Sequence, residues 1–343
     1  MRTMPAPRGP ITESLFERLQ GPPAGCFATP AIERPHAPLD DEDLQLALYC
    51  CYELHYGGLP GVDDRWEWDP GLLELRAALE ELFEHALLEQ IGPPSDSAAP
   101  EEMDLALRAI ADADDAPSLS KFVERHASVE QVHEFVIHRS AYQLKEADPH
   151  SWALPRLSGP PKAALVEIQA DEYGGGRPER IHATMFARSM EALGLDSESG
   201  AYLDAIPGVT LATVNLMSLL GLHRRWRGAI VGHLALFEMT SSIPNRRYAN
   251  GLRRLGFGQD ATAFFDEHVE ADAVHEQVAA VDLAGGLVRQ DPERGADILW
   301  GARALATLDA RWALAVLDAW QREHSSLREA DPAAGEARVA AGI

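Results

Sequence analysis

Apolar residues recur with the period of an α-helix along most of this chain, and the alternating pattern of a β-strand is almost absent. The clearest helical series lies in one segment and consists of Leu72, Leu75, Leu79, Leu82, Phe83 and Ala86. Such a stripe covers one face of a helix and has to be buried against other helices. We therefore expect an all-α fold.

Proline and glycine divide this helical pattern into segments. We expect a Pro/Gly-rich irregular arm over residues 1–40, an N-terminal helical extension over 41–115, a larger helical domain over 116–325 and a frayed tail over 326–343. The helices expected in the larger domain span about 118–147, 161–173, 179–193, 209–220, 228–254 with a break at Pro244, 260–285 and 292–322.

The charge balance excludes several classes of partner. The 343 residues contain 54 Asp and Glu against 30 Lys and Arg, which gives a formal net charge of −24. Proteins that bind nucleic acid or anionic membranes need clustered basic residues, and here these residues are outnumbered. A hydrophobic share of 46% also argues against general disorder. We expect a soluble protein that binds neither nucleic acid nor membranes.

The cysteines and the longest apolar run indicate the compartment. The three cysteines, Cys26, Cys50 and Cys51, have no C-x-x-C spacing, so neither a disulfide framework nor a thiolate metal site is expected. The longest apolar run, residues 209–222, is shorter than the roughly 20 residues of a membrane span, and the first 17 residues lack a signal-peptide core. We expect a cytoplasmic protein.

The strongest chemical signal is the helical segment that contains His268, Asp272 and His275. These residues fall within about 60° of one another on one helix face. The same face carries Phe264 and Ala279, so it is expected to point toward the core. Each residue alone would be read as a packing or capping residue. Together, two imidazoles and a carboxylate on a buried face favour a metal site.

Four further inward positions complete this candidate site. Glu172 shares a face with Leu165 and Ile168, whereas Glu167 and Asp171 lie on a face expected to be solvated. The other three positions occupy apolar stripes or segments of neighbouring helices: Glu146, His182 and Glu238. Three histidines and four carboxylates without thiolate suit iron or manganese, and bridging carboxylates suit a pair of ions.

One alternative concerns the carboxylate that accompanies His182. Glu179 and His182 form an acid-x-x-His pair of the kind used in ferritin-like diiron bundles. We favour Glu172, because Glu179 lies beside Arg177 and Arg180 in a first helical turn, where an exposed acid is common. His150 is assigned to a surface or packing role.

The sequence resembles the haem-oxygenase-like diiron oxidases and oxygenases, a family of iron-containing redox enzymes. The resemblance covers about residues 118–325 and rests on three stretches: residues 152–157 (WALPRL), residues 162–174 (KAALVEIQADEYG) and the His268-x3-Asp272-x2-His275 helix. It implies a haem-oxygenase-like helical bundle with two iron ions held by Glu146, Glu172, His182, Glu238, His268, Asp272 and His275.

The resemblance also implies an activity. We expect an O2-dependent oxygenase or oxidase that acts on a small organic substrate, by N-oxygenation or by oxidative C–C or C–H cleavage. The resemblance is also compatible with an electron donor such as an iron–sulfur protein and with a homodimer. Two alternatives remain open on the same fold: a haem-binding protein, with His126, His133 or His138 as axial ligand, and a non-catalytic metal-binding protein.

Overall fold

The structure is a computed structural model that describes residues 4–23, 32–113 and 116–329, without the side chains of residues 270–274. Every regular element in these ranges is helical and none is a β-strand, which confirms the all-α fold. The contacts divide the chain into two units. The first contains the described residues up to Gly92, Ala201–Asn215 and those from Leu327 onward, and the second contains Pro93–Gly200 and Leu216–Ser326.

Within its described residues, the first unit contains three complete α-helices, one 3-10 helix and the start of a further α-helix. Asp69 caps the longest of them by accepting hydrogen bonds from the backbone N–H groups of Gly71 and Leu72. Five of the six residues of the apolar series predicted from the sequence are buried on this helix, and only Leu82 is partly exposed. The elements are α1 (Pro10–Leu19), α2 (Glu42–Glu53), η1 (Asp64–Trp68), α3 (Pro70–Ile91) and the beginning of α10 (Gly208–Leu222).

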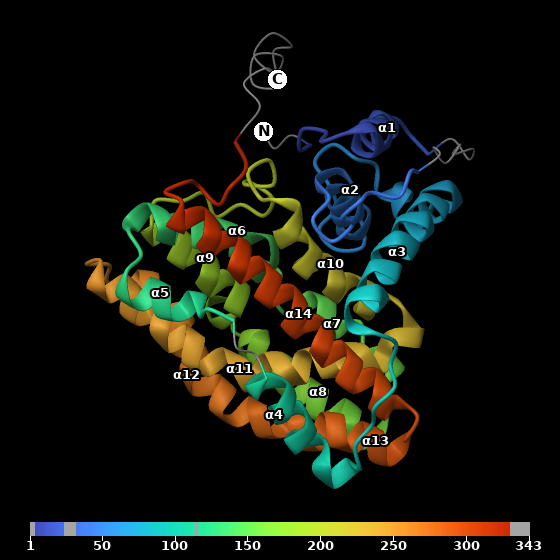
Figure 1. The fold of residues 1–343 in the computed structure, drawn as a ribbon, viewed down its shortest axis with the longest axis vertical. Helices are drawn as coiled ribbons and strands as arrows, with labels where there is room; N and C mark the ends of the chain where they lie inside the picture. The colour runs from blue at the N-terminus through green and yellow to red at the C-terminus, as the bar shows by residue number, and fades with distance from the viewer. Residues whose placement is uncertain (1–3, 24–31, 114–115, 330–343) are drawn as a thin grey trace. The chain divides into compact units, whose positions relative to one another are not determined.

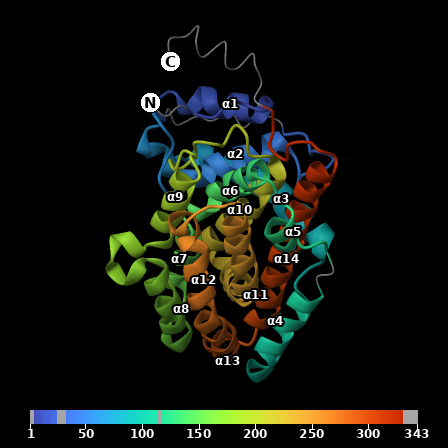
Figure 2. The same ribbon diagram turned by 90° about the vertical axis from the view of Figure 1, so that its left-hand side faces the viewer.

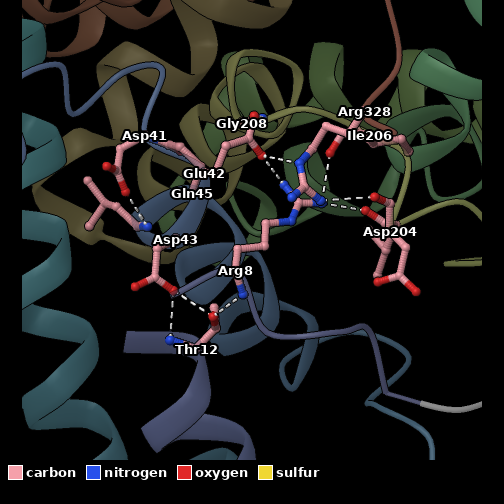
Figure 3. A network of polar contacts seen from close by, with 12 residues as sticks. Arg8, Thr12, Asp41, Glu42, Asp43, Gln45, Asp204, Ile206, Gly208 and Arg328 are labelled. Atoms are coloured by element: carbon pink, nitrogen blue, oxygen red, sulfur yellow. Dashed lines mark hydrogen bonds and ion pairs between the residues drawn. The ribbon is translucent and has the colours of Figure 1, made fainter. Parts of the chain in front are cut away.

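A partly buried ion-pair network centred on Arg8 lies just before α1 in the sequence (Figure 3). The Arg8 guanidinium lies 2.6 Å from a carboxylate oxygen of Glu42, and it also donates to the carbonyl oxygens of Leu203 and Ile206. Arg328 contacts the same Glu42 oxygen at 3.1 Å. Burying the Arg8 side chain is tolerable because its charge is paired with Glu42 and its two terminal nitrogens have acceptors; Nε alone has none among the described residues.

The helix α1 differs from the irregular arm expected over residues 1–40. The Asp43 carboxylate accepts hydrogen bonds from the backbone N–H groups of Ile11 and Thr12, each at 2.8 Å (Figure 3). These N–H groups belong to the first turn of α1, and the backbone N–H groups of a first turn have no acceptors within their own helix. A side chain 31 or more positions away therefore caps α1, and local sequence patterns do not reveal such a cap.

In the second unit, the long helix α11 (Arg227–Arg254) contacts α5 (Leu119–Arg125), α12 (Gln259–Gln277) and α14 (Arg294–Gln321). Figure 1 and Figure 2 both show α11 with α12 and α14 beside it. The π-helical segment η7 (Val278–Gly285) continues α12. The remaining elements are η2 (Pro100–Glu102), α4 (Met103–Asp112), α6 (Val129–Gln143), α7 (Asp148–Ser151), η3 (Leu154–Arg156), α8 (Gly159–Glu172), η4 (Gly174–Gly176), η5 (Pro178–Arg180), α9 (His182–Ala192), the end of α10, η6 (Arg224–Trp226) and α13 (Gly286–Gln290).

Two glycines allow α11 and α14 to approach each other closely. A methyl group on Gly232 would overlap the carbonyl oxygen of Ile298, and a methyl group on Gly301 would overlap that of Ala229. The two helix backbones are therefore in direct contact at this crossing. This contact limits the position of α11, which also carries Glu238 of the candidate site.

Two expected helix boundaries differ from the structure. The helix expected over 118–147 is split, because Ser128 caps α6 in a capping box with Gln131. The break expected at Pro244 is absent, and α11 continues through this residue. Pro244 removes the hydrogen bond to the carbonyl of Thr240, but Thr240 is exposed and water can replace the missing donor.

Two further observations concern the expected organisation. The helix α4, expected in the N-terminal extension, belongs to the second unit. Among the described helices, none combines the length and the apolar composition that crossing a membrane requires.

Because His138 is buried, we expect the second unit to lose stability as the pH falls. Nε2 of His138 lies 3.0 Å from the hydroxyl of Ser326, and that hydroxyl donates to Glu134. Burial lowers the pKa of His138 to about 3. The unfolded chain binds a proton near pH 6.5 and the folded chain does not, so stability falls as the pH drops below about 6.5.

We expect His138→Gln to remove this contribution. Between pH 6.5 and 4, the free energy of unfolding of the wild type should decrease more steeply, by up to about 1.4 kcal/mol per pH unit, than that of the variant. Urea unfolding followed by tryptophan fluorescence at several pH values measures both slopes. If the free energies of unfolding of the wild type and the variant change with pH in parallel, His138 does not cause the loss of stability in acid.

Candidate metal centre

Five segments of the second unit deliver the predicted site residues. The turn between α6 and α7, the last residue of α8 and the first residue of α9 each contribute one side chain, α11 contributes another, and α12 contributes the rest. Every described member is buried: Glu146, Glu172, His182, Glu238, His268 and His275. Asp272 lies in α12, but its side chain is outside the described residues.

These side chains form two adjoining groups, and within each group one ligand atom per residue lies within 4.8 Å of every other. The first group consists of Glu146, Glu172, His182 and His268, and the second consists of Glu172, Glu238 and His275. Glu172 belongs to both. The arrangement fits two cations that share one carboxylate.

The site contains buried polar atoms that lack hydrogen-bond partners within the described part of the chain. They are Oε2 of Glu146, Oε2 of Glu172, Nδ1 of His182 and Nδ1 of His275. Nδ1 of His182 lies 2.9 Å from Oε2 of Glu172, which is ion-pair distance, but the geometry is not that of a hydrogen bond. Leaving such atoms unpaired costs several kcal/mol in total, at about 1–3 kcal/mol each. A bound cation would satisfy them, so the residues fit a metal centre.

The backbone of α12 fixes the orientation of His268. Its Nδ1–H donates to the carbonyl oxygen of Phe264 at 2.8 Å, because a carbonyl can only accept. The other nitrogen, Nε2, lies 3.4 Å from Oε1 of Glu146 and is therefore the nitrogen on the side of the first group. Metal-binding histidines are commonly oriented by a hydrogen bond of this kind.

His275 is held between two carboxylates. Its Nδ1 lies 3.4 Å from Oε2 of Glu238, inside the second group. Its Nε2 lies 3.1 Å from Oδ2 of Asp171. The carboxylate of Asp171 is largely exposed, as expected from its position on α8, but its contact with His275 was not predicted.

The charges of the site shift the pKa values of its members against the effect of burial. Burial raises the pKa of Glu172, but His182 outweighs this effect and the pKa lies below its usual value. Burial lowers the pKa of His275, but Glu238 and Asp171 raise it overall to about 9. Without a metal, the imidazole of His275 is therefore positively charged at neutral pH, with a proton on each of its two nitrogens. Binding of a cation has to displace one of these protons.

A cavity of about 20 Å³ adjoins the first group. A water molecule needs roughly 10–15 Å³ by this measure, so the cavity has room for about one small molecule. Apart from the site carboxylates and His268, its walls are made by Tyr142, Ala147, His150, Gln169, Leu234, Phe237 and Ser241.

His150 has a partner that the sequence pattern did not reveal. Its Nε2 lies 3.1 Å from Nδ1 of His233, and both rings are buried. Burial lowers the pKa of His150 to about 4. The pair is therefore neutral at physiological pH and places an uncharged imidazole in the wall of the cavity.

The structure also bears on the choice between Glu172 and Glu179. Glu179 lies in η5, is exposed and belongs to neither group. Its backbone carbonyl accepts a hydrogen bond from Arg188. The geometry therefore favours Glu172.

Comparisons with known proteins agree with this fold and indicate a family. The sequence profile of a family described as iron-containing redox enzymes matches residues 113–310. A nitrosourea synthase of Streptomyces achromogenes subsp. streptozoticus is 30% identical over 146 residues, which are 42% of this chain and 31% of that protein. This chain thus aligns with less than a third of that relative's length.

A solved structure supports the fold. A CADD-like protein of unknown function from Nostoc punctiforme superposes with a TM-score of 0.51 at 18% identity, over 64% of this chain and 98% of that chain. At this identity the likeness concerns the fold alone. It agrees with the haem-oxygenase-like helical bundle expected from the sequence.

Proposed function

This chain belongs to the family of iron-containing redox enzymes, and we propose that it is an O2-dependent oxygenase or oxidase with two iron ions at the buried site. Its substrate in this proposal is a small organic molecule. The observation that carries the proposal is the set of buried nitrogen and oxygen atoms of Glu146, Glu172, His182 and His275 that have no hydrogen-bond partner among the described residues. Imidazoles and carboxylates in such a set are suitable ligands for metal cations.

The two groups assign residues to two ions. Glu146, His182 and His268 would hold the first ion and Glu238 and His275 the second, with Glu172 shared between them. Asp272 stays a proposed ligand because of its place between His268 and His275 in the sequence of α12, and it is assigned to neither ion. The four carboxylates would offset the charge of two divalent ions, which makes burial of the whole set tolerable.

Iron bound in this set supplies the electrons for reduction of O2. The chain's own contribution is positioning and exclusion of water. Tyr142, His150 and Ser241 offer hydrogen-bonding groups in the cavity wall, and Leu234 and Phe237 make the rest of it apolar. A cavity of about 20 Å³ is far below the roughly 300–1,000 Å³ of pockets for organic ligands, so the substrate has to bind beside it or widen it.

Two reaction types remain within the proposal. The relative that makes a nitrosourea supports N-oxygenation of a substrate nitrogen. Oxidative cleavage of a C–C or C–H bond uses the same metal chemistry. The haem-binding alternative is disfavoured by a small cavity lined with three glutamates, because a haem needs a much larger and more apolar pocket.

Iron loading and reaction with O2 test the proposal. We expect the wild type, loaded anaerobically with Fe(II), to retain about two iron ions per chain and to give a transient absorption change on mixing with O2 in a stopped-flow instrument. His268→Ala should lose iron, because it removes a proposed ligand. Retention of no more than one ion by the wild type, or the absence of any O2-dependent change, would overturn the proposal, and a Soret band after haem addition would favour the alternative.

A further inference from the structure

We propose that Asp171 is a positioning residue that holds His275 in the tautomer and orientation needed to bind the second metal ion. The inference rests on the proposed function, because it concerns a ligand of that site. It starts from the hydrogen bond of 3.1 Å between Nε2 of His275 and Oδ2 of Asp171. An ionised carboxylate can only accept, so Nε2 carries the proton in this contact.

The tautomer follows from this contact. A neutral imidazole carries one proton, and if Asp171 holds that proton on Nε2, then Nδ1 presents its lone pair. Nδ1 is the atom that faces Glu238 at 3.4 Å and that has no hydrogen-bond partner in the described part of the chain. Asp171 therefore selects the nitrogen that a metal ion in the second group would need.

The position of Asp171 beside Glu172 gives the contact a second consequence. Both residues lie at the end of α8, where Glu172 reaches into the two metal groups and Asp171 reaches to α12. The hydrogen bond ties the end of α8 to α12 and helps to hold Glu172 next to His275. Two helices that supply ligands are thus joined by a residue outside the ligand set.

A different contact holds the same helix end on its other side and supplies a control. The Tyr173 hydroxyl donates to Asp148 at 2.7 Å and lies 3.0 Å from the hydroxyl of Ser151. Tyr173→Phe removes these contacts but leaves the contact with His275 intact. An effect that arises only from loosening of α8 should therefore be the same in Tyr173→Phe as in an Asp171 variant.

The test is metal affinity measured ion by ion with Co(II) and Fe(II), by competition with a chromophoric chelator and without O2. We expect Asp171→Ala to weaken the second ion, identified as the one that His275→Ala weakens, by about 10–100-fold and to change the first ion little, since the loss of such outer partners typically has this size. Asp171→Asn keeps an acceptor oxygen and should restore part of the affinity. Glu167→Ala, one turn earlier on the exposed face of α8, should match the wild type.

The tautomer itself is a second readout. In long-range 1H–15N spectra of the Zn(II)-loaded protein, the wild type should show His275 protonated at Nε2 with metal at Nδ1, and Asp171→Ala should show weakened or mixed protonation. Unchanged affinity in Asp171→Ala, or an equal loss in Tyr173→Phe, would overturn the positioning role while leaving the proposed function intact. A wild type that binds no second ion would overturn both.

Discussion

Glu172→Ala is expected to impair both metal positions, which would distinguish it from substitution of any other proposed ligand. Glu172 is the residue common to the two groups, so its removal takes one carboxylate from each. We expect both ions to bind more weakly by more than about 100-fold, beyond the effect of losing an outer partner. Iron analysis after gel filtration, together with chelator competition for each ion, measures the loss.

Two variants make this prediction specific. Glu179→Ala should retain both ions, because Glu179 is exposed and outside both groups. His275→Ala should weaken the second ion far more than the first. If Glu172→Ala binds two ions with wild-type affinity, Glu172 is not the shared ligand and Glu179 becomes the candidate to examine.

The candidate site could be predicted in large part because helical register is a local property. The spacing of His268, Asp272 and His275 places them on one face without knowledge of any other helix. Helical register also identified Glu172 and Glu238 as acids in apolar surroundings, and in the structure these two side chains lie in one group with His275. Their role as iron ligands remains a prediction.

The unpredicted contacts are those between residues far apart in sequence. Asp171 and His275 are separated by 104 positions, and His150 and His233 by 83. Periodicity placed Asp171 on a solvated face, and its carboxylate is indeed mostly exposed, yet one oxygen reaches His275. A pattern along one helix describes which way a side chain points but does not identify the neighbour that it meets.

The ordering of α1 has the same explanation. Its first turn is capped by Asp43 of α2. Residues 1–40 are rich in proline and glycine, and composition alone favoured an irregular arm. Contacts within the first unit override that local tendency.

Gly232→Ala should destabilise the second unit although alanine is the better helix former. In an exposed helix this substitution would stabilise by about 0.5–1 kcal/mol. Here the added methyl group would overlap the carbonyl oxygen of Ile298, a backbone atom that cannot move without displacing α14. Overpacking of a core typically costs about 1–3 kcal/mol, and a clash with backbone belongs at or above the upper end.

We therefore expect a loss of about 3 kcal/mol in the free energy of unfolding for Gly232→Ala, measured by urea unfolding of the metal-free protein. Gly258→Ala is the control, since a methyl group at Gly258 meets no atom within 4 Å and the change there should stay within about 0.5 kcal/mol. A Gly232→Ala variant as stable as the wild type would mean that α11 and α14 lie further apart. Because Gly232 and Glu238 belong to the same helix, a displaced α11 should also weaken the second ion, which links the packing of the bundle to the metal site.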